Sequence, residues 1–249
     1  MNVSLYQAAA AMNANARWQE LISENLADSS VPGARKQDVS FAAIEAGLPS
    51  GQLGPNADRF VMPTARGAIN FTQGEINPTS VNTDFAIDGP GFFQVKLPNG
   101  SAAYTRDGEF QLNAQGQLVT KRGFPVMGDS GPIQLDPNNS APLTVASTGE
   151  VSQGGEPKGR IKMVEFKDPH DLTVAGAGYY LSNDPSQKPM DAQTSLLRQG
   201  YLEAANTSPT TEMTSLITAM RMFESNQKVL QMQDDRMGRV ITDLGGTGS

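Results

Sequence analysis

Residues 24–37, ENLADSSVPGARKQ, decide where the first helix of this chain ends and where the rest of the fold begins. The first residues of this stretch can continue a helix, but Asp-Ser-Ser at 28–30 competes with the helix for backbone hydrogen bonds. The dipeptide Pro32-Gly33 then interrupts regular structure, and a basic pair follows at 35–36. The stretch therefore predicts the end of a helix and a change in the direction of the chain.

The segment before this stretch predicts a long helix, because residues 1–28 contain neither Gly nor Pro. Small and apolar side chains recur in it with a heptad-like spacing, interrupted by polar Asn15 and Gln19. This spacing favours packing against another helix, and an ordinary amphipathic helix on a globular core is the alternative. The stripe residues that we expect to make subunit contacts are Leu5, Met12, Ile22 and Leu26.

A second long helix is predicted near the C-terminus. Ser208-Pro209 suits its N-cap and first position, and Gly245-Gly246 suits its end. A helix of about 35 residues is roughly 50 Å long at 1.5 Å per residue. Its apolar residues also recur every seven positions, so we expect the two terminal helices to pair as a coiled coil. The contact residues expected here are Met213, Leu216, Met220, Phe223, Leu230 and Met237.

The middle of the chain, residues 77–200, predicts an antiparallel β domain. Short β-prone runs alternate with turn signals such as Asn99-Gly100 and Asp107-Gly108, which are typical of hairpins. No segment is long enough for the helical crossovers that a parallel sheet needs. The predicted strands are residues 85–87, 92–96, 102–106, 110–112, 118–120, 124–127, 133–135, 143–146, 160–166 and 179–181.

These segments predict an α+β fold with four parts. Residues 1–30 form the N-terminal helix and residues 201–249 the C-terminal helix of an inner coiled-coil domain. Residues 31–76, with Gly and Pro throughout, could form a flexible linker, but the large apolar residues scattered along them favour an extended connecting segment laid along another part of the protein. Residues 77–200 form the β domain.

The composition excludes several classes of function. The net charge of −7 argues against a general affinity for nucleic acid, which requires clustered basic residues. No apolar run approaches the roughly 20 residues of a membrane-spanning helix, so we expect no membrane insertion. The chain contains no Cys, which removes disulfides and thiolate metal sites. The N-terminus does not read as a cleaved signal peptide, so any export must leave it intact.

A hydrolase built on the β domain is the enzymatic alternative. Its candidate residues are carboxylates, which could act as a pair in glycoside chemistry, but carboxylates beside Gly in turns are mostly structural. The single histidine, His170, lies in a polar KDPHD loop without a nucleophile motif. The sequence therefore predicts no enzyme and no catalytic, cofactor-binding or metal site. The carboxylates of the alternative are Asp84, Asp88, Asp107 and Glu109.

Three motifs, in order along nearly the whole chain, resemble bacterial flagellar rod and hook axial proteins. The first is a helix running into ENLADSSVPGARKQ, and the second is DFAIDGPGFFQV followed by YTRDGEFQLNAQGQLVTKRGFPVMG. The third is the C-terminal segment that begins GYLEAANTSPTTEM. Within this family the length and the compact β domain resemble the proximal rod protein most, with the distal rod protein close behind and hook proteins usually longer. The third motif carries Leu202, Glu203, Asn206, Glu212, Met213, Arg221, Phe223, Glu224, Asn226 and Lys228.

The resemblance implies a structural subunit of the flagellar basal-body rod. It implies helical assembly through the terminal helices, with copies of itself and other rod proteins, into the shaft that carries torque across the periplasm. It also implies export by the flagellar type III apparatus without cleavage. A coiled-coil binding module, such as an adhesin or adaptor, is the alternative from a different class.

The resemblance further implies that the stretch at 24–37 is where the chain leaves the inner helical layer. Ala34 stands where the family usually has Phe or Tyr, and Phe41 is a candidate to replace that aromatic side chain. The residues that we expect to form this chain-exit motif are Asn25, Leu26, Ala27, Pro32 and Gly33.

Overall fold

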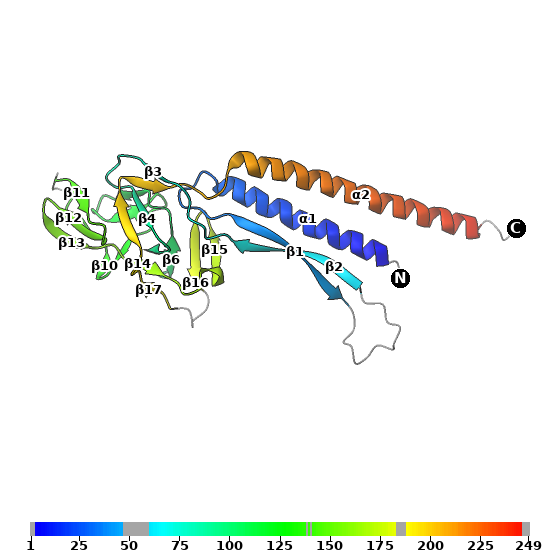
Figure 1. Ribbon diagram of the computed structural model, residues 1–249, viewed down its shortest axis with the longest axis horizontal. Helices are drawn as coiled ribbons and strands as arrows, with labels where there is room; N and C mark the ends of the chain where they lie inside the picture. The colour runs from blue at the N-terminus through cyan, green and yellow to red at the C-terminus, as the bar shows by residue number, and fades with distance from the viewer. Residues whose placement is uncertain (1–2, 47–59, 138, 140, 183–187, 246–249) are drawn as a thin grey trace. The chain divides into compact units, whose positions relative to one another are not determined.

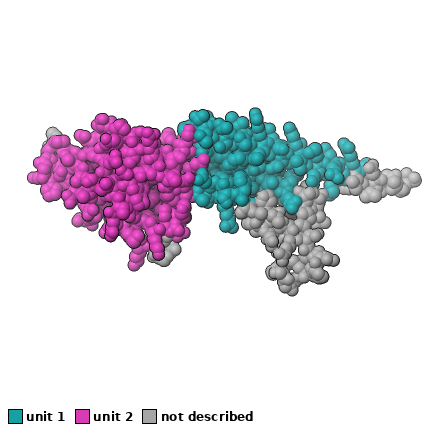
Figure 2. All heavy atoms as spheres, in the orientation of Figure 1, with its two compact units in different colours: residues 1–25, 37–68, 209–249 teal, residues 26–36, 69–208 magenta. Residues whose placement is uncertain are grey.

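The computed structural model describes residues 3–46, 60–137, 139, 141–182 and 188–245. The chain divides into two compact units (Figure 2). Unit 1 consists of residues 1–25, 37–68 and 209–249, and unit 2 of residues 26–36 and 69–208. The short segment 26–36 therefore belongs to unit 2, although the residues on both sides of it belong to unit 1.

Unit 1 is built from two helices and a two-stranded sheet. Its helices are α1 (Val3–Asp28) and α2 (Pro209–Gly245), and its strands are β1 (Gln37–Ala46) and β2 (Phe60–Ile69). Helix α1 ends where the sequence places its stop, and α2 begins at the predicted proline. Figure 1 shows α1 running beside both α2 and the β1–β2 sheet.

Helix α1 packs on the β1–β2 sheet through its largest buried side chain. Leu21 is fully buried, and its methyl groups lie 3.3 Å from the position that a Cβ atom would take on Gly67 of β2. Trp18 contacts Phe41 of β1 edge to face, with 5.6 Å between the ring centroids. The sheet therefore covers a face of α1 outside the heptad-like stripe, which does not include Leu21 or Trp18.

The predicted coiled coil of the two terminal helices is wrong. A coiled coil buries its apolar seam between the helices, whereas Met213, Met220 and Met237 of α2 are each about half exposed (53%, 51% and 47%). The helices approach each other where Gln19 donates a hydrogen bond to the carbonyl of Ala219 at 3.3 Å. The described residues do not form a continuous apolar seam between the two helices, because one side of α1 contacts α2 and another side contacts the β1–β2 sheet.

The connecting segment contains strands that pair with each other. It supplies β1 and β2 to their own sheet, and at its end begins β3 (Ile76–Pro78), which pairs with β19 (Tyr201–Glu203). Residues 47–59 of this segment lie outside the described residues. Pairing satisfies the backbone hydrogen-bonding groups that an isolated extended segment would leave to water.

Unit 2 is an antiparallel β structure around a six-stranded sheet, in agreement with the predicted middle. The order of this sheet is β15-β16-β6-β5-β14-β17, and its pairings are antiparallel. Its strands are β5 (Phe92–Lys96), β6 (Ala102–Thr105), β14 (Met163–Glu165), β15 (Leu172–Gly176), β16 (Tyr179–Ser182) and β17 (Met190–Asp191).

Smaller antiparallel sheets complete unit 2. Strands β11, β12 and β13 form a three-stranded sheet, while β4 pairs with β18, β7 with β8, and β9 with β10. A 3-10 turn at Pro169–Asp171 precedes β15. The strands are β4 (Phe85–Asp88), β7 (Phe110–Leu112), β8 (Leu118–Thr120), β9 (Met127–Gly128), β10 (Gly131–Pro132), β11 (Leu143–Val145), β12 (Glu150–Gln153), β13 (Glu156–Arg160) and β18 (Leu196–Gln199).

The central strands of the six-stranded sheet are buried on both faces. Neighbouring residues of β5 belong to different clusters, because successive side chains of a strand point to opposite faces. Phe93 belongs to the larger cluster with Tyr179, and Phe92 belongs to the smaller cluster with Tyr180. The smaller cluster is aromatic, with Phe92 lying edge to face with Tyr180 at 5.9 Å between centroids. This aromatic face borders the charged site described next.

Candidate functional site

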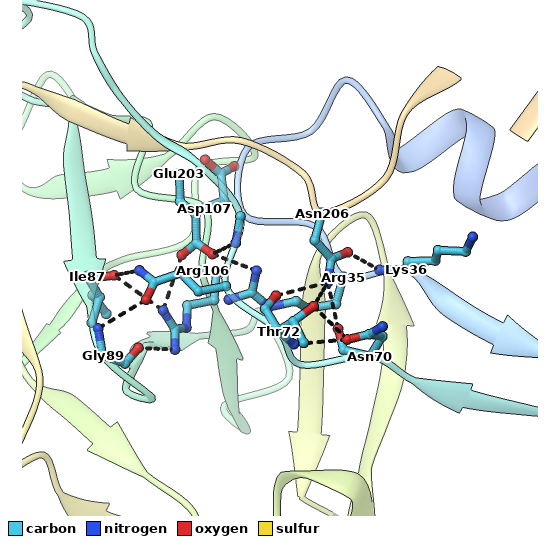
Figure 3. A network of polar contacts seen from close by, with 12 residues as sticks. Arg35, Lys36, Asn70, Thr72, Ile87, Gly89, Arg106, Asp107, Glu203 and Asn206 are labelled. Carbon is cyan, nitrogen blue, oxygen red and sulfur yellow. Dashed lines mark hydrogen bonds and ion pairs between the residues drawn. The ribbon is translucent and has the colours of Figure 1, made fainter. Parts of the chain in front are cut away.

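The most unusual site of unit 2 is a buried carboxylate held by two arginines (Figure 3). Glu203, at the end of β19, accepts a hydrogen bond from Arg35 at 2.5 Å and another from Arg106 at 3.1 Å. The backbone N–H of Gly74 also donates to it at 2.9 Å. The side chains of Arg35 and Glu203 are fully buried, and that of Arg106 is nearly so. We call these three side chains the Glu203 triad.

The second arginine of the triad is held by backbone and aromatic groups as well. Arg106 donates to the carbonyl of Gly89 at 2.6 Å and to that of Ile87 at 3.3 Å, and its guanidinium lies 5.0 Å from the centre of the Phe92 ring. Burial lowers the pKa of Arg106 to about 10, against the opposing effect of Glu203. The guanidinium therefore remains charged at neutral pH. A buried charge of this kind requires its partners, since removing one leaves the others uncompensated.

The Glu203 triad joins three segments that are distant in the sequence. Arg35 comes from the short segment after α1, Arg106 follows β6, and Glu203 ends the last strand before α2. The backbone supports the same junction, because Gly33 N–H donates to the carbonyl of Glu203 at 2.7 Å. The N–H of Arg35 donates to the Tyr180 hydroxyl at 3.1 Å, and burial raises the pKa of that hydroxyl to about 12. The site is thus a structural junction inside unit 2.

Gly33 explains why the sequence needs Pro-Gly at this point. Its φ of +68° lies in the left-handed region that favours glycine. A Cβ atom at this position would lie 2.4 Å from the backbone carbonyl of Arg106. The absence of a side chain therefore allows the segment to approach the backbone beside the triad.

A second polar residue of the C-terminal motif fastens the same segment. Asn206 accepts a hydrogen bond from the N–H of Lys36 at 2.6 Å. Its amide group donates to the carbonyls of Asn70 at 2.8 Å and Thr72 at 3.0 Å (Figure 3). The side chain of Asn206 thus bonds backbone groups of Lys36, Asn70 and Thr72 that would otherwise need partners in a neighbouring strand.

Asn25 plays a comparable part in unit 1. Its side chain is buried and makes a reciprocal pair with the backbone of Gln37, accepting from the N–H at 2.8 Å and donating to the carbonyl at 2.9 Å. The Gln37 side chain donates to Glu24 at 2.9 Å. The side chain of Asn25 therefore holds together the two residues of unit 1 that flank segment 26–36.

The remaining chain-exit residues lie around these bonds. Ala34 is 2% exposed, and its carbonyl accepts from the N–H of Asn206 at 3.2 Å. Phe41, the candidate to replace the missing aromatic, instead contacts Trp18 in unit 1 and is 53% exposed. Leu26 and Pro32 are half-buried, and Ala27 is exposed.

The expected subunit-contact residues fall into different environments. In α1, Ile22 is buried and Met12 is half-buried, and the side chain of Leu5 lies outside the described residues. In α2, the expected contact residues differ in exposure: three are half-buried and three are exposed. The seven-residue pattern did not distinguish these two sets. The half-buried set is Leu216, Phe223 and Leu230, and the exposed set is Met213, Met220 and Met237.

The carboxylates of the enzymatic alternative make structural contacts. Asp107 is buried and accepts from the N–H of Glu109 at 2.9 Å, and burial raises its pKa to about 6. Glu109 pairs with Lys121 at 2.7 Å, and Asp88 pairs with Arg198 at 2.5 Å. In the described part of the chain, no three His, Asp or Glu side chains gather as metal ligands would. No described helix is long and apolar enough to cross a membrane.

Sequence reasoning missed the Glu203 triad, although its residues lie in the three motifs quoted above. Arg106 directly follows an apolar strand, and Glu203 lies between Leu202 and Ala204. A charged residue in an apolar setting is a signal of a buried ion pair. The local sequence does not indicate which residue pairs with which, because Arg106 and Glu203 are 97 positions apart.

Two family models match this chain. The flagellar hook protein FlgE/F/G D1 domain matches residues 86–153, and the flagellar basal body rod FlgEFG protein C-terminal model matches residues 198–243. The second match includes both Glu203 and Asn206.

Similar proteins cover nearly the whole chain. The flagellar basal-body rod protein FlgF of Caulobacter vibrioides is 36% identical over 92% of this chain and 92% of its own length. The rod protein FlgG of Buchnera aphidicola is 32% identical over 95% and 98% of the two chains, and FlgF of Mesorhizobium japonicum is 30% identical over 98% and 99%. With this identity over almost its full length, the chain belongs to the flagellar basal-body rod protein family.

Proposed function

We propose that this chain is a structural subunit of the flagellar basal-body rod that joins its neighbours through exposed apolar side chains of α2. Membership of the flagellar basal-body rod protein family supports this proposal. We further propose helical assembly with copies of itself and other rod proteins, so that the rod carries torque. Its role is that of a contact surface and not of an enzyme.

The observation that carries the proposal is the distribution of apolar side chains around α2. One side of the helix is covered within the subunit, where Ala219 and Glu212 are buried. Two further stripes are exposed, with spacings of i, i+4, i+7 and of i, i+7, i+10. Their six side chains, each 40–58% exposed, are Met213, Ile217 and Met220 in the first stripe and Met222, Val229 and Met232 in the second.

An amphipathic helix on the surface of a protein has one apolar face, and a helix that is apolar on several sides is normally buried. Two exposed stripes beside a covered side therefore favour at least two neighbours for α2. The half-buried Leu216, Phe223 and Leu230, with Met12, Ile22 and Leu26 of α1, would support the helices from within the subunit. We also propose that the chain reaches the rod through the flagellar type III export apparatus without cleavage.

The test is a charge placed in each exposed stripe. Ile217→Asp and Val229→Asp each bury a carboxylate if α2 contacts neighbours, and a buried unpaired charge costs several kcal/mol. We expect at least about a tenfold loss of the chain from purified basal bodies, since 1.4 kcal/mol corresponds to a factor of ten. The readout is the amount of chain per basal body, measured by immunoblot in a strain that expresses only the variant.

Gln115→Asp is the control, because it adds the same charge at an exposed polar position in a turn outside α2. It should leave incorporation within about twofold of wild type, as surface substitutions usually cost little. Circular dichroism of each purified variant checks that the helices still form. Normal incorporation of both Ile217→Asp and Val229→Asp would contradict the proposal.

A further inference from the structure

Methionine is concentrated on the exposed stripes of α2. Five of the 11 methionines of the chain lie in this helix. Four of them, which we call the α2 methionines, are each at least 50% exposed. They are Met213 (53%), Met220 (51%), Met222 (50%) and Met232 (58%).

We infer that the α2 methionines are an oxidation site whose conversion to methionine sulfoxide prevents the subunit from assembling. This inference rests on the proposed contact role of α2. The reagent that it requires is a peroxide, for which hydrogen peroxide is the simplest example. Nothing in the proposed assembly role itself requires thioether chemistry at these positions.

The chemistry needs only an accessible thioether. A lone pair of the methionine sulfur attacks one peroxide oxygen, an S–O bond forms, and the O–O bond breaks. The sulfur loses two electrons and becomes a sulfoxide, while the peroxide is reduced to water after proton transfer. Exposure therefore decides which methionines react first. The α2 methionines meet this condition, whereas Met163 in the core of unit 2 is 6% exposed and does not.

The product is unsuited to an apolar contact. Methionine packs well against varied neighbours because its side chain is unbranched and its sulfur is polarizable. The sulfoxide is polar and must lose its hydration when the stripe is covered, so it weakens Met-rich interfaces. Because the four residues are distributed over both stripes, oxidation affects both proposed contacts. An assembled subunit has these sulfurs covered, so the unassembled subunit is the sensitive form.

The experiment measures how sulfoxide partitions between assembled and unassembled chain. Expression of the wild-type chain is induced during a sublethal pulse of hydrogen peroxide, and the peroxide is removed before the new subunits assemble. Peptide mass spectrometry then maps sulfoxides in purified basal bodies and in the unassembled pool. We expect the α2 methionine sulfoxides to be depleted at least about tenfold from basal bodies relative to that pool, because the sulfoxide opposes apolar contact. Met190 is the matched control, since it is 52% exposed on β17 and lies outside α2. Its sulfoxide should occur equally in both fractions.

A four-leucine variant provides the second arm. Replacing the α2 methionines by Leu keeps the stripes apolar at similar volume and removes the oxidisable sulfur. Its incorporation should be insensitive to a peroxide dose that lowers incorporation of newly made wild-type chain about tenfold, as expected when the sulfoxide is the cause. Treating oxidised wild-type chain with methionine sulfoxide reductases should restore its ability to assemble.

The outcomes separate this inference from the proposed function. Equal sulfoxide fractions at the α2 methionines in basal bodies and in the unassembled pool would overturn the inference. Slower oxidation of these residues than of Met163 in the purified chain would overturn it as well. If Ile217→Asp and Val229→Asp still block incorporation in that case, the contact role of α2 survives and the oxidation site alone is rejected.

Discussion

Arg35 and Glu203, 168 positions apart in the chain, form an ion pair in which neither side chain is exposed to solvent. The pair joins the segment that follows the first helix to the strand that precedes the last one. Both segments belong to unit 2. The charges of this pair, with Arg106, therefore hold segment 26–36 and strand β19 to the same β structure.

Replacing Glu203 tests this relationship directly. Glu203→Gln should lower the free energy of unfolding of unit 2 by about 3–5 kcal/mol, because it leaves Arg35 and Arg106 buried without a countercharge. Amide exchange in β5 and β6 reports the stability of unit 2 specifically. Glu156→Gln is the control, since Glu156 is 73% exposed in its pair with Lys158, and its loss should cost less than about 1 kcal/mol.

Replacing all three charges of the triad tests whether its stability depends on the ion pairs or only on filling the buried space. A triple variant with Arg35→Met, Arg106→Met and Glu203→Leu should be more stable than Glu203→Gln, because apolar groups of similar volume carry no desolvation cost. If Glu203→Gln costs less than about 1 kcal/mol, the ion pair does not hold the segments as we describe.

Gly33→Ala tests the close approach beside the triad. The left-handed backbone alone costs an alanine about 1–2 kcal/mol, and the contact with the Arg106 backbone adds to this cost. Gly100→Ala is the matched control, because Gly100 also has a positive φ (+85°) but has no atom within 4 Å of the Cβ position. Urea unfolding should show Gly33→Ala to be less stable than Gly100→Ala by at least about 2 kcal/mol, typical of overpacking. If both variants lose the same stability, the backbone beside Arg106 must shift to accommodate the added methyl group.

Asn25→Ala should loosen the start of β1. The variant removes two hydrogen bonds to the backbone of Gln37, and unsatisfied buried groups cost about 1–3 kcal/mol each. The measurement is hydrogen exchange at the Gln37 amide, which should become at least about tenfold faster for a loss of 1.4 kcal/mol. Asn13→Ala, at an exposed position of the same helix, should leave that amide unchanged. Unchanged exchange in Asn25→Ala would show that other contacts hold β1.

Local patterns predicted much of the β structure. Strands at 92–96, 110–112 and 118–120 agree with the structure to the residue, because each has apolar or β-branched residues next to a turn signal. Strand β13, EPKGR, was missed because it is polar and mostly exposed, so no alternation marks it. Its partner β12 supplies the pairing that its own sequence does not reveal.

Interactions between distant segments could not be predicted in the same way. A heptad-like stripe shows that a helix has an apolar side, but it does not show what covers that side. In α1 the side of the helix that packs on strand β2 carries Leu21, which the stripe does not include, and in α2 the methionines of the stripes are exposed. The Glu203 triad is hidden for a related reason, since the motifs that contain Arg35, Arg106 and Glu203 become neighbours only after folding.

Asp107 gives unit 2 a stability that depends on pH. Burial raises the pKa of Asp107 from 3.8 to about 6, and the charges of Glu109 and Asp84 act in the same direction. The hydrogen bond from the Glu109 N–H and the charge of Lys121 oppose them. Between about pH 4 and pH 6 the folded state therefore binds this proton more tightly than the unfolded state does. The contribution of Asp107 to stability is full below about pH 4 and is lost as the pH rises through about 6.

Asp107→Asn should therefore stabilise unit 2 at pH 7. The amide is neutral at every pH and its oxygen can still accept from the Glu109 N–H, while a shift of about two units corresponds to about 3 kcal/mol at most. Urea unfolding at pH 4 and pH 7 should show a gain at pH 7 and little change at pH 4. Asp129→Asn removes an exposed carboxylate of the same unit and should not produce this difference. A variant at Asp107 that is less stable than wild type at pH 7 would mean that the ionised carboxylate is needed, because its charge then stabilises the turn by more than its burial costs.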